Sequence, residues 1–255
     1  MSEPVLYEVL DGVAWLTINR PEARNALNRA VREGLLEGFT RFGADSSAGV
    51  LVLTGAGDRA FSAGGDLKEM AESGLQVPPP DFIPYLGRTV QVDKPVIAAV
   101  NGVAYAGGFL LAQMCDLCVA ADHARFAITE ARWGRGAPWA GPLPWLIPPR
   151  VAMELLLTAE PIDAQRAYGI GLVNKVVPGD ELRAATQALA ATIAANAPLS
   201  VRAGKAMVYA AAEAGWQAAI DRGEELFEPA YLSDDAREGP RAFSEGRAPR
   251  WTGAR

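Results

Sequence analysis

Hydrophobic positions in the first hundred residues predict short strands that alternate with helices. Residues 6–10 and 13–18 flank an Asp-Gly pair, which is typical of a hairpin turn. Two further runs, 50–54 and 96–100, are apolar almost throughout, as in buried strands. Over 28–41, apolar side chains recur at helical spacing behind an asparagine that can cap the helix. The pattern therefore predicts an α/β fold.

Helical spacing becomes dominant toward the end of the chain. Further strands are expected at 117–120, 125–128 and 173–177, and helices from residue 67 and at 83–92, 108–115, 143–157, 164–168 and 181–195. From Pro198 onward, the segments 199–212, 215–227 and 233–244 have helix-period apolar residues and no strand pattern. The change divides the chain into a core of residues 1–197 and a helical region of residues 198–255.

Two glycine-rich runs are the main candidates for a functional site. They occupy residues 60–67 (AFSAGGDL) and 101–111 (NGVAYAGGFLL), each between an apolar run and a predicted helix. A tight glycine turn at a helix start aims free backbone N–H groups at one spot. Two such turns can place two donors on one oxygen, which makes an oxyanion hole. On the glycines alone, two ordinary strand-to-helix turns are the alternative.

The composition limits which classes of molecule this protein is expected to bind. The chain has 255 residues, half of them hydrophobic, and this suits one compact core with a helical extension. Its net charge of −6 argues against a broad nucleic-acid surface but leaves room for a small anionic ligand near Arg20, Arg24 and Lys68. Neither a signal peptide nor an apolar run of about 20 residues is evident, so we expect a cytoplasmic protein without a membrane partner.

The cysteines and the histidine do not suggest a metal or nucleophile site. Cys115 and Cys118 form a C-x-x-C pair within an apolar run, without a second pair, and this favours core packing. The only histidine, His123, lies in a polar turn, and no G-x-S-x-G sequence accompanies it. We therefore expect neither a metal ion nor a serine triad.

Several segments in register resemble the enoyl-CoA hydratase/isomerase (crotonase) family. They are NRPEARNALN at 19–28, LTGAG at 53–57, FSAGGDLKEM at 61–70, KPVIAAVNG at 94–102, MCDLCVAA at 114–121, ARF at 124–126 and, near the end, AFSE at 242–245. The matches keep the family's order and cover most of residues 1–180. The resemblance implies a crotonase-like spiral of β-β-α units, with a C-terminal helical region that packs a homotrimer or a dimer of trimers.

The resemblance also implies an acyl-CoA thioester as substrate and no separate cofactor. An enolate of such a thioester gathers charge on its oxygen, and by position the backbone N–H groups of Gly65 and Gly107 would hold it. An arginine, Arg247, stands close to where the family's last helix often supplies a lysine to CoA. The residues carried over to the adenine, phosphate and pantetheine parts of CoA are Arg24, Ala26, Ala63, Asp66 and Leu67.

The chain departs from the family's hydratases at one of two glutamates. The first falls at Leu110, which cannot transfer a proton, and the second at Glu130. A single carboxylate can still move a proton between the α- and γ-carbons of an enoyl-CoA, so the expected reaction is isomerisation. Hydration, another enolate reaction such as decarboxylation, and a CoA-binding scaffold without activity are the alternatives.

The residues around Glu130 lead to two further predictions, one on its pKa and one on the loop that follows it. Its place at a strand end beside apolar residues predicts a raised pKa, although an acid that complements a helix N-terminus is the alternative. The loop that follows lacks the carboxylate that some family members add for hydrolysis. Its larger side chains either shape an acyl pocket or form a surface loop with packed tryptophans: Arg132, Trp133, Arg135 and Trp139.

Overall fold

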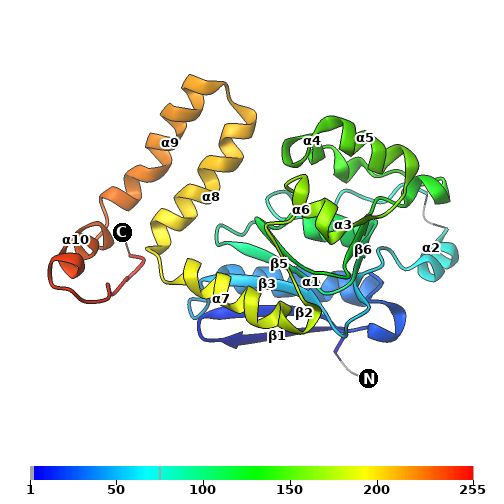
Figure 1. The fold of residues 1–255 in the computed structure, drawn as a ribbon, viewed down its shortest axis with the longest axis horizontal. Coiled ribbons are helices and arrows are strands. Elements are labelled where there is room, and N and C mark those ends of the chain that lie inside the picture. The colour runs from blue at the N-terminus through cyan, green and yellow to red at the C-terminus, as the bar shows by residue number, and fades with distance from the viewer. Residues whose placement is uncertain (1–2, 75, 255) are drawn as a thin grey trace.

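The computed structural model describes residues 3–74 and 76–254, whose strands form two sheets (Figure 1). The first sheet has the order β1-β2-β3-β5-β7-β10, and the second has the order β4-β6-β8-β9. The strands are β1 (Val5–Leu10), β2 (Val13–Ile18), β3 (Val50–Gly55), β4 (Ala60–Ser62), β5 (Val96–Val100), β6 (Val103–Tyr105), β7 (Leu117–Ala121), β8 (Arg125–Ala127), β9 (Ile162–Asp163) and β10 (Lys175–Val177). All neighbours pair in parallel except β1 with β2 and β8 with β9.

Helices connect and cover these strands. The α-helices are α1 (Arg29–Ala44), α2 (Leu67–Ser73), α3 (Gly107–Gln113), α4 (Leu143–Leu146), α5 (Pro149–Thr158), α6 (Ala164–Gly169), α7 (Leu182–Ala194), α8 (Pro198–Glu213), α9 (Trp216–Tyr231) and α10 (Asp235–Ser244). Short 3₁₀ helices are η1 (Pro21–Ala23), η2 (Glu130–Trp133), η3 (Pro138–Ala140) and η4 (Gly179–Glu181). Among the described residues, no helix combines the length and the hydrophobicity needed to cross a membrane.

The predicted hairpin is confirmed, and its second strand is covered on both faces. Asp11 and Gly12 form the turn with φ angles of 49° and 75°, which match the twist of the flanking strands. In β2, Trp15 donates to Gln187 of α7, whereas Leu16 packs beneath Gly38 of α1. Successive side chains of a strand point to opposite faces, so α1 and α7 enclose the sheet between them.

The prediction that the glycine turns directly follow the long apolar strands is wrong in one respect. A short strand lies between each apolar strand and its turn: β4 after β3, and β6 after β5. Each has only three residues, too few for alternation to be read from the sequence. These strands belong to the second sheet, and the chain therefore passes from one sheet to the other before each turn.

Two predicted helices also differ from the structure. Residues 83–92 contain no helix, because the segment folds into a turn in which the N–H groups of Thr89 and Val90 donate to the Tyr85 carbonyl. The helix expected at 143–157 is divided into α4 and α5. Ile147, which precedes Pro148, is extended at φ −138° and ψ 160°, as a following proline requires.

The two cysteines lie in the core. Cys115 and Cys118 are free thiols within the apolar cluster between the sheet and the helices. Burial disfavours the thiolate and raises the pKa of Cys118 to about 12. These surroundings suit packing rather than thiol chemistry.

The last three helices extend from the sheets (Figure 1). Helices α8 and α9 run side by side, and α10 follows with a tail that returns toward the start of α8. Lys205 and Tyr209 of α8 reach Asp116 at 2.9 and 2.8 Å, and Trp251 donates to the Ala195 carbonyl at 2.7 Å. The division of the chain after residue 197 remains a prediction.

Candidate active site

Three parallel strands bring the two glycine turns and Glu130 to one edge of the second sheet. β4, β6 and β8 are neighbours, and each runs in the same direction. The carboxyl ends of parallel strands meet at the same edge of a sheet. The first turn follows β4, the second follows β6, and Glu130 lies three residues beyond β8.

The two glycine turns are in contact. Gly64 has a φ of +92°, and a Cβ on it would lie 2.8 Å from the Tyr105 carbonyl oxygen and 3.1 Å from the Gly107 nitrogen. Only glycine fits this approach and this backbone conformation without strain. A Cβ on Gly107 would lie 3.7 Å from the Gly64 Cα, so the contact is mutual.

The second turn is strained at Ala106. This residue has a φ of 50° and a ψ of −120°, a conformation that alanine rarely adopts. Its N–H donates to the Ala127 carbonyl of β8 at 3.0 Å, which ties the turn to the neighbouring strand. Gly107 follows as the first residue of α3. Within the described residues, the N–H groups of Gly65 and Gly107 donate no hydrogen bond.

A buried asparagine that the sequence analysis did not single out supports the first turn. Asn25 is fully buried with a φ of 55°, and its side-chain amide donates to the carbonyls of Ala56 and Ala60 at 3.0 and 2.7 Å. Ser62 donates to the Asn25 carbonyl at 2.8 Å and accepts from the Gly64 N–H at 3.2 Å. Asparagine tolerates the left-handed conformation, and this was the available signal within the 19–28 motif.

Glu130 is a carboxyl with one satisfied oxygen and one buried, unpaired oxygen. Its Oε1 accepts from the Trp139 indole N–H at 3.1 Å. Its Oε2 is buried and has no hydrogen-bond partner among the described residues. Burial raises the pKa of Glu130, and the hydrogen bonds from its own backbone N–H and from Trp139 oppose this only in part. A raised pKa makes the carboxyl a stronger base than a solvated glutamate, which suits a group that takes up and releases a proton.

Leu110 and Phe109 are buried apolar side chains of α3, here called the apolar wall. Leu110 is 3% exposed in α3, three residues after Gly107. The neighbouring Phe109 is fully buried and contacts Trp139, with ring centroids 5.9 Å apart. Of the loop side chains expected near the acyl group, Trp139 lies against this wall, whereas Trp133 is 63% exposed and Arg132 pairs with Glu160 at 2.7 Å.

The five residues carried over for CoA lie on the adjoining loop and turn. The Ala63 N–H donates to the Arg24 carbonyl at 3.0 Å, which joins the two segments. Arg24 is exposed, and no described residue pairs with its guanidinium. Ala26 accepts from Arg20 through its carbonyl at 2.8 Å, and Leu67 begins α2 with its side chain 53% exposed.

Asp66 has a structural role in this turn. Its carboxylate accepts from Arg20 at 3.1 Å and caps α2 through the N–H groups of Lys68 and Glu69. Burial opposes the charge, but the bonds from Arg20, Glu69 and Lys68 outweigh it and hold the pKa of Asp66 below its ordinary value. Arg20 is therefore engaged by Asp66, whereas Arg24 and Lys68 are exposed and form no ion pair with the described residues.

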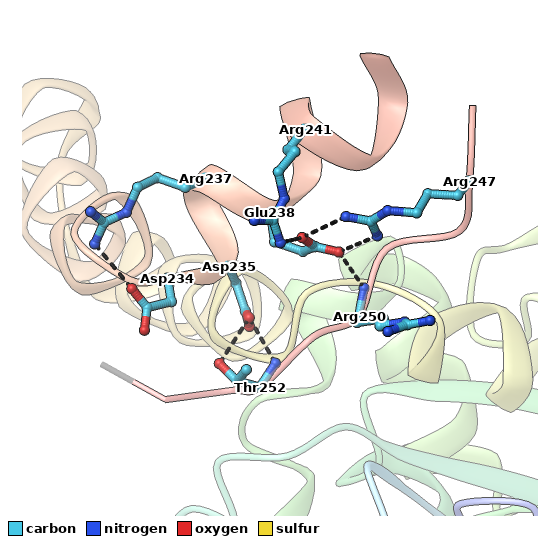
Figure 2. A pocket seen from close by; sticks show the side chains of 8 residues that line it. All are labelled: Asp234, Asp235, Arg237, Glu238, Arg241, Arg247, Arg250 and Thr252. Carbon is cyan, nitrogen blue, oxygen red and sulfur yellow. Dashed lines mark hydrogen bonds and ion pairs between the residues drawn. The ribbon is translucent and has the colours of Figure 1, made fainter. Parts of the chain in front are cut away.

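Arg247 lies in a separate hollow of about 520 Å³ in the C-terminal region (Figure 2). Its guanidinium binds Glu238 at 2.6 and 3.0 Å and Glu245 at 2.5 Å. The side chains that line the hollow are Asp234, Asp235, Arg237, Glu238, Arg241, Arg247, Arg250 and Thr252. In this conformation Arg247 is held by carboxylates of its own chain.

The sequence profile of one family, described as enoyl-CoA hydratase/isomerase, matches residues 8–254. The chain belongs to the enoyl-CoA hydratase/isomerase family. It is 38% identical to the carnitinyl-CoA dehydratase of Proteus mirabilis, in an alignment that covers 99% of this chain and 100% of the relative. The identity is 40% to the carnitinyl-CoA dehydratase of Salmonella typhi, with 93% of this chain and 94% of the relative covered.

Solved structures of the family have the same fold. An enoyl-CoA hydratase from Mycobacterium tuberculosis H37Rv superposes with a TM-score of 0.91 at 39% identity, over 99% of this chain and 100% of the other. A probable enoyl-CoA hydratase/isomerase from Mycobacterium abscessus gives 0.88 at 41% identity, over the same shares. The crotonase-like fold predicted from the sequence is therefore confirmed.

Proposed function

We propose that this chain isomerises enoyl-CoA thioesters, with Gly65 and Gly107 as oxyanion donors and Glu130 as the only acid/base. The Glu130 carboxylate takes the α-proton of a 3-enoyl-CoA, and the negative charge spreads onto the thioester oxygen. The two backbone N–H groups stabilise that oxygen. The same carboxyl then returns the proton to the γ-carbon, which gives the 2-enoyl-CoA. The group ends in its starting state, so one carboxyl suffices.

The observation that carries this proposal is the contrast between Glu130 and Leu110. Glu130 has a buried oxygen without a partner and a raised pKa, as a proton shuttle needs. Leu110 is buried in α3 and offers no hydrogen bond to a water molecule. Proton transfer is thus supported, whereas the second carboxylate that would orient water is absent from the position where the family's hydratases have it.

For CoA, we assign Arg24 to the phosphates and Ala26, Ala63, Asp66 and Leu67 to the adenine and pantetheine. The support is their shared location on the loop before α1 and the turn into α2. The open guanidinium of Arg24 suits an anionic ligand. Asp66 would act through the turn that it caps, because its carboxylate is already occupied by Arg20.

We also propose a homotrimer or a dimer of trimers. Helices α8 and α9 expose apolar side chains, among them Val208 at 66%, Trp216 at 85% and Ile220 at 45%. Apolar groups on a projecting helix pair are typical of a buried interface. Light scattering should give three or six times the 27.0 kDa mass of the chain, and a monomer at micromolar concentration would contradict this assignment.

The reaction is tested with a panel of CoA thioesters. Purified protein should convert 3-enoyl-CoA to 2-enoyl-CoA faster than it hydrates 2-enoyl-CoA. The variant Leu110→Glu should gain hydration, and Leu110→Met is its matched control because methionine keeps the apolar volume. Rapid hydration of crotonyl-CoA by the unmodified protein would overturn isomerisation as the favoured reaction. Binding of CoA without turnover of any thioester would indicate a scaffold.

Dehydration is the second candidate, and the relatives favour it. Two of them, at 38% and 40% identity, are carnitinyl-CoA dehydratases. In such a reaction Glu130 would take the α-proton and give it to the departing β-hydroxyl, so that water leaves and a double bond forms. Carnitinyl-CoA therefore belongs in the panel, and a higher kcat/KM for it than for 3-enoyl-CoA would select dehydration.

A further inference from the structure

Trp139 contacts the proposed acid/base and the helix that begins at the proposed oxyanion turn. Its indole N–H donates to Oε1 of Glu130 at 3.1 Å. Its backbone carbonyl accepts from the side-chain amide of Gln113 at 3.1 Å. Its ring packs on Phe109, with centroids 5.9 Å apart and planes at 38°. The Trp139 indole is the side-chain donor whose hydrogen bond lowers the pKa of Glu130.

These contacts of Trp139 are made with buried residues. Phe109 is fully buried and Gln113 is 7% exposed, and both lie in α3, which begins at Gly107. Trp139 itself belongs to η3, where the next residue, Ala140, is 2% exposed. A side chain fixed at its backbone and at its ring can hold its N–H in one direction. The indole N–H therefore has a set position relative to α3.

We propose that Trp139 is the positioning residue of the Glu130 carboxyl. It holds Oε1, so that the carboxyl presents only Oε2 to the substrate. Because the same tryptophan is packed on α3, it also fixes the carboxyl relative to the Gly107 N–H. The distance between the group that moves the proton and the N–H that holds the developing oxyanion is then constant. This inference rests on the proposed role of Glu130 as acid/base.

Loss of the indole N–H has two expected effects on Glu130. The carboxyl can rotate, so that fewer encounters with the α-carbon are productive. The carboxylate also loses the hydrogen bond from Trp139, and the pKa of Glu130 rises further, since this bond lowers it. A base with a higher pKa is deprotonated at higher pH, so the acid limb of the kcat–pH profile moves upward.

The variant Trp139→Phe tests the inference, because phenylalanine keeps a ring against Phe109 and the backbone carbonyl toward Gln113. We expect kcat to fall about 10- to 100-fold, the range for a hydrogen bond to a charged group, with KM nearly unchanged. The acid limb should move to higher pH. Trp145→Phe is the matched control, because Trp145 is 71% exposed, and it should leave both quantities unchanged.

A double variant separates positioning from a general structural effect. If Trp139 acts through Glu130, then Trp139→Phe should cause no further loss of kcat in a Glu130→Gln background. An additive loss, or a single variant with an unmoved acid limb, would overturn the positioning role. A Glu130→Gln protein with normal kcat would instead remove the proposed function itself, whatever Trp139 does.

Folding of the variant is checked by circular dichroism. Should Trp139→Phe fail to fold, 3-benzothienylalanine at position 139 replaces the N–H by sulfur and keeps the shape of the ring. The same loss of kcat and the same shift of the acid limb are expected. An unchanged profile with this residue would contradict the inference independently of the phenylalanine variant.

Discussion

Two regions of this molecule place carboxylates in opposite surroundings. At the edge of the second sheet, Glu130 accepts one side-chain hydrogen bond, and its second oxygen is buried without a partner. In the C-terminal hollow, Glu238 accepts from Arg241 and Arg247 and from the Arg250 N–H (Figure 2). Asp235 beside it accepts from Thr252 and from the Gly253 N–H.

The pKa values of the two glutamates move in opposite directions. Bonds from Arg247, the Arg250 N–H and Arg241 hold the pKa of Glu238 well below its ordinary value. Burial raises the pKa of Glu130. A carboxylate whose lone pairs are all engaged contributes to the fold, whereas one kept partly unpaired is available to a reactant. The difference teaches that a hollow lined by charged side chains need not be a reactive one.

The largest expected effect is on turnover at the unpaired carboxyl. Glu130→Gln should lower kcat by about 10²–10⁴, the range for a general acid/base, and leave CoA binding intact. Since the raised pKa makes the Glu130 charge unfavourable in the fold at neutral pH, the amide should leave the free energy of unfolding unchanged or higher. Steady-state kinetics and urea unfolding measure the two quantities.

Glu160→Gln is the control for that variant, since Glu160 pairs with Arg132 at the surface with 72% of its side chain exposed. It should retain kcat. If a stable Glu130→Gln protein has the same kcat as this control, then Glu130 is no more reactive than the carboxylates of the C-terminal region, and the contrast between the two regions is removed.

The next effect concerns the backbone donors. Gly107→Val should reduce kcat about 10²–10³-fold, the cost of one lost oxyanion donor. The Gly107 φ is not in the left-handed region, but a Cβ there would lie 2.8 Å from Ile83 and 3.0 Å from Leu27, so the helix start must shift. Gly204→Val in α8 is the control, since the nearest atom to its added Cβ is 3.9 Å away. Near-normal kcat in a folded Gly107→Val protein would exclude Gly107 as a donor.

In the C-terminal region, substitution should change stability and not turnover. Asp235→Ala removes the buried carboxylate that accepts from the N–H groups of Thr252 and Gly253, which costs about 1–3 kcal/mol. Chemical unfolding should show this loss, while kcat per folded molecule stays close to that of the unmodified protein. The neighbouring Asp234→Ala is the control, because Asp234 pairs at the surface with Arg237, and it should have little effect. A large fall in kcat for Asp235→Ala would extend the functional site into this region.

The smallest expected effect is a change in pH dependence. The folded-state pKa of Glu238 is lowered, so its contribution to stability is present above the unfolded-state pKa and is lost as the pH falls toward the folded-state value. Glu238→Gln should therefore lower stability at neutral pH and flatten the loss in acid. Unfolding midpoints between neutral pH and pH 3 would reveal it. Parallel curves for the two proteins would mean that Glu238 behaves as a solvated carboxylate.

The sequence predicted those parts of the fold that depend on local chemistry and on long patterns. The Asp-Gly hairpin, the asparagine cap of α1 and the C-terminal helices are confirmed with small changes of boundary. The three-residue strands β4 and β6 were missed, since their pairing partners lie far apart in the sequence. The prediction of a helix at 83–92 was wrong. The apolar residues of this segment lie in a turn, so their spacing does not reflect a helical face.

At the candidate site, the sequence motifs predicted which positions are involved. The residues that contact these positions are known only from the structure. The positions of Gly65, Gly107 and Glu130 followed from the resemblance, and their roles remain predictions. The bond from Trp139 to Glu130 spans nine residues and depends on the fold of a loop rich in glycine and proline. The engagement of Arg247 by Glu238 was also not predictable, since i,i+9 pairs have no helical periodicity.

The alanine at position 106 has a consequence for how the second turn behaves before substrate arrives. Its conformation, at φ 50°, costs about 1–3 kcal/mol for a non-glycine residue. Glycine would avoid this cost, but it would also give the turn many more conformations to sample. The methyl group of Ala106 thus lowers stability, but it restricts the turn so that the N–H of Gly107 points in a narrow range of directions. In the proposed role of oxyanion donor, the Gly107 N–H would then need little reorganisation when negative charge develops, whereas a flexible turn would have to reorganise at every turnover.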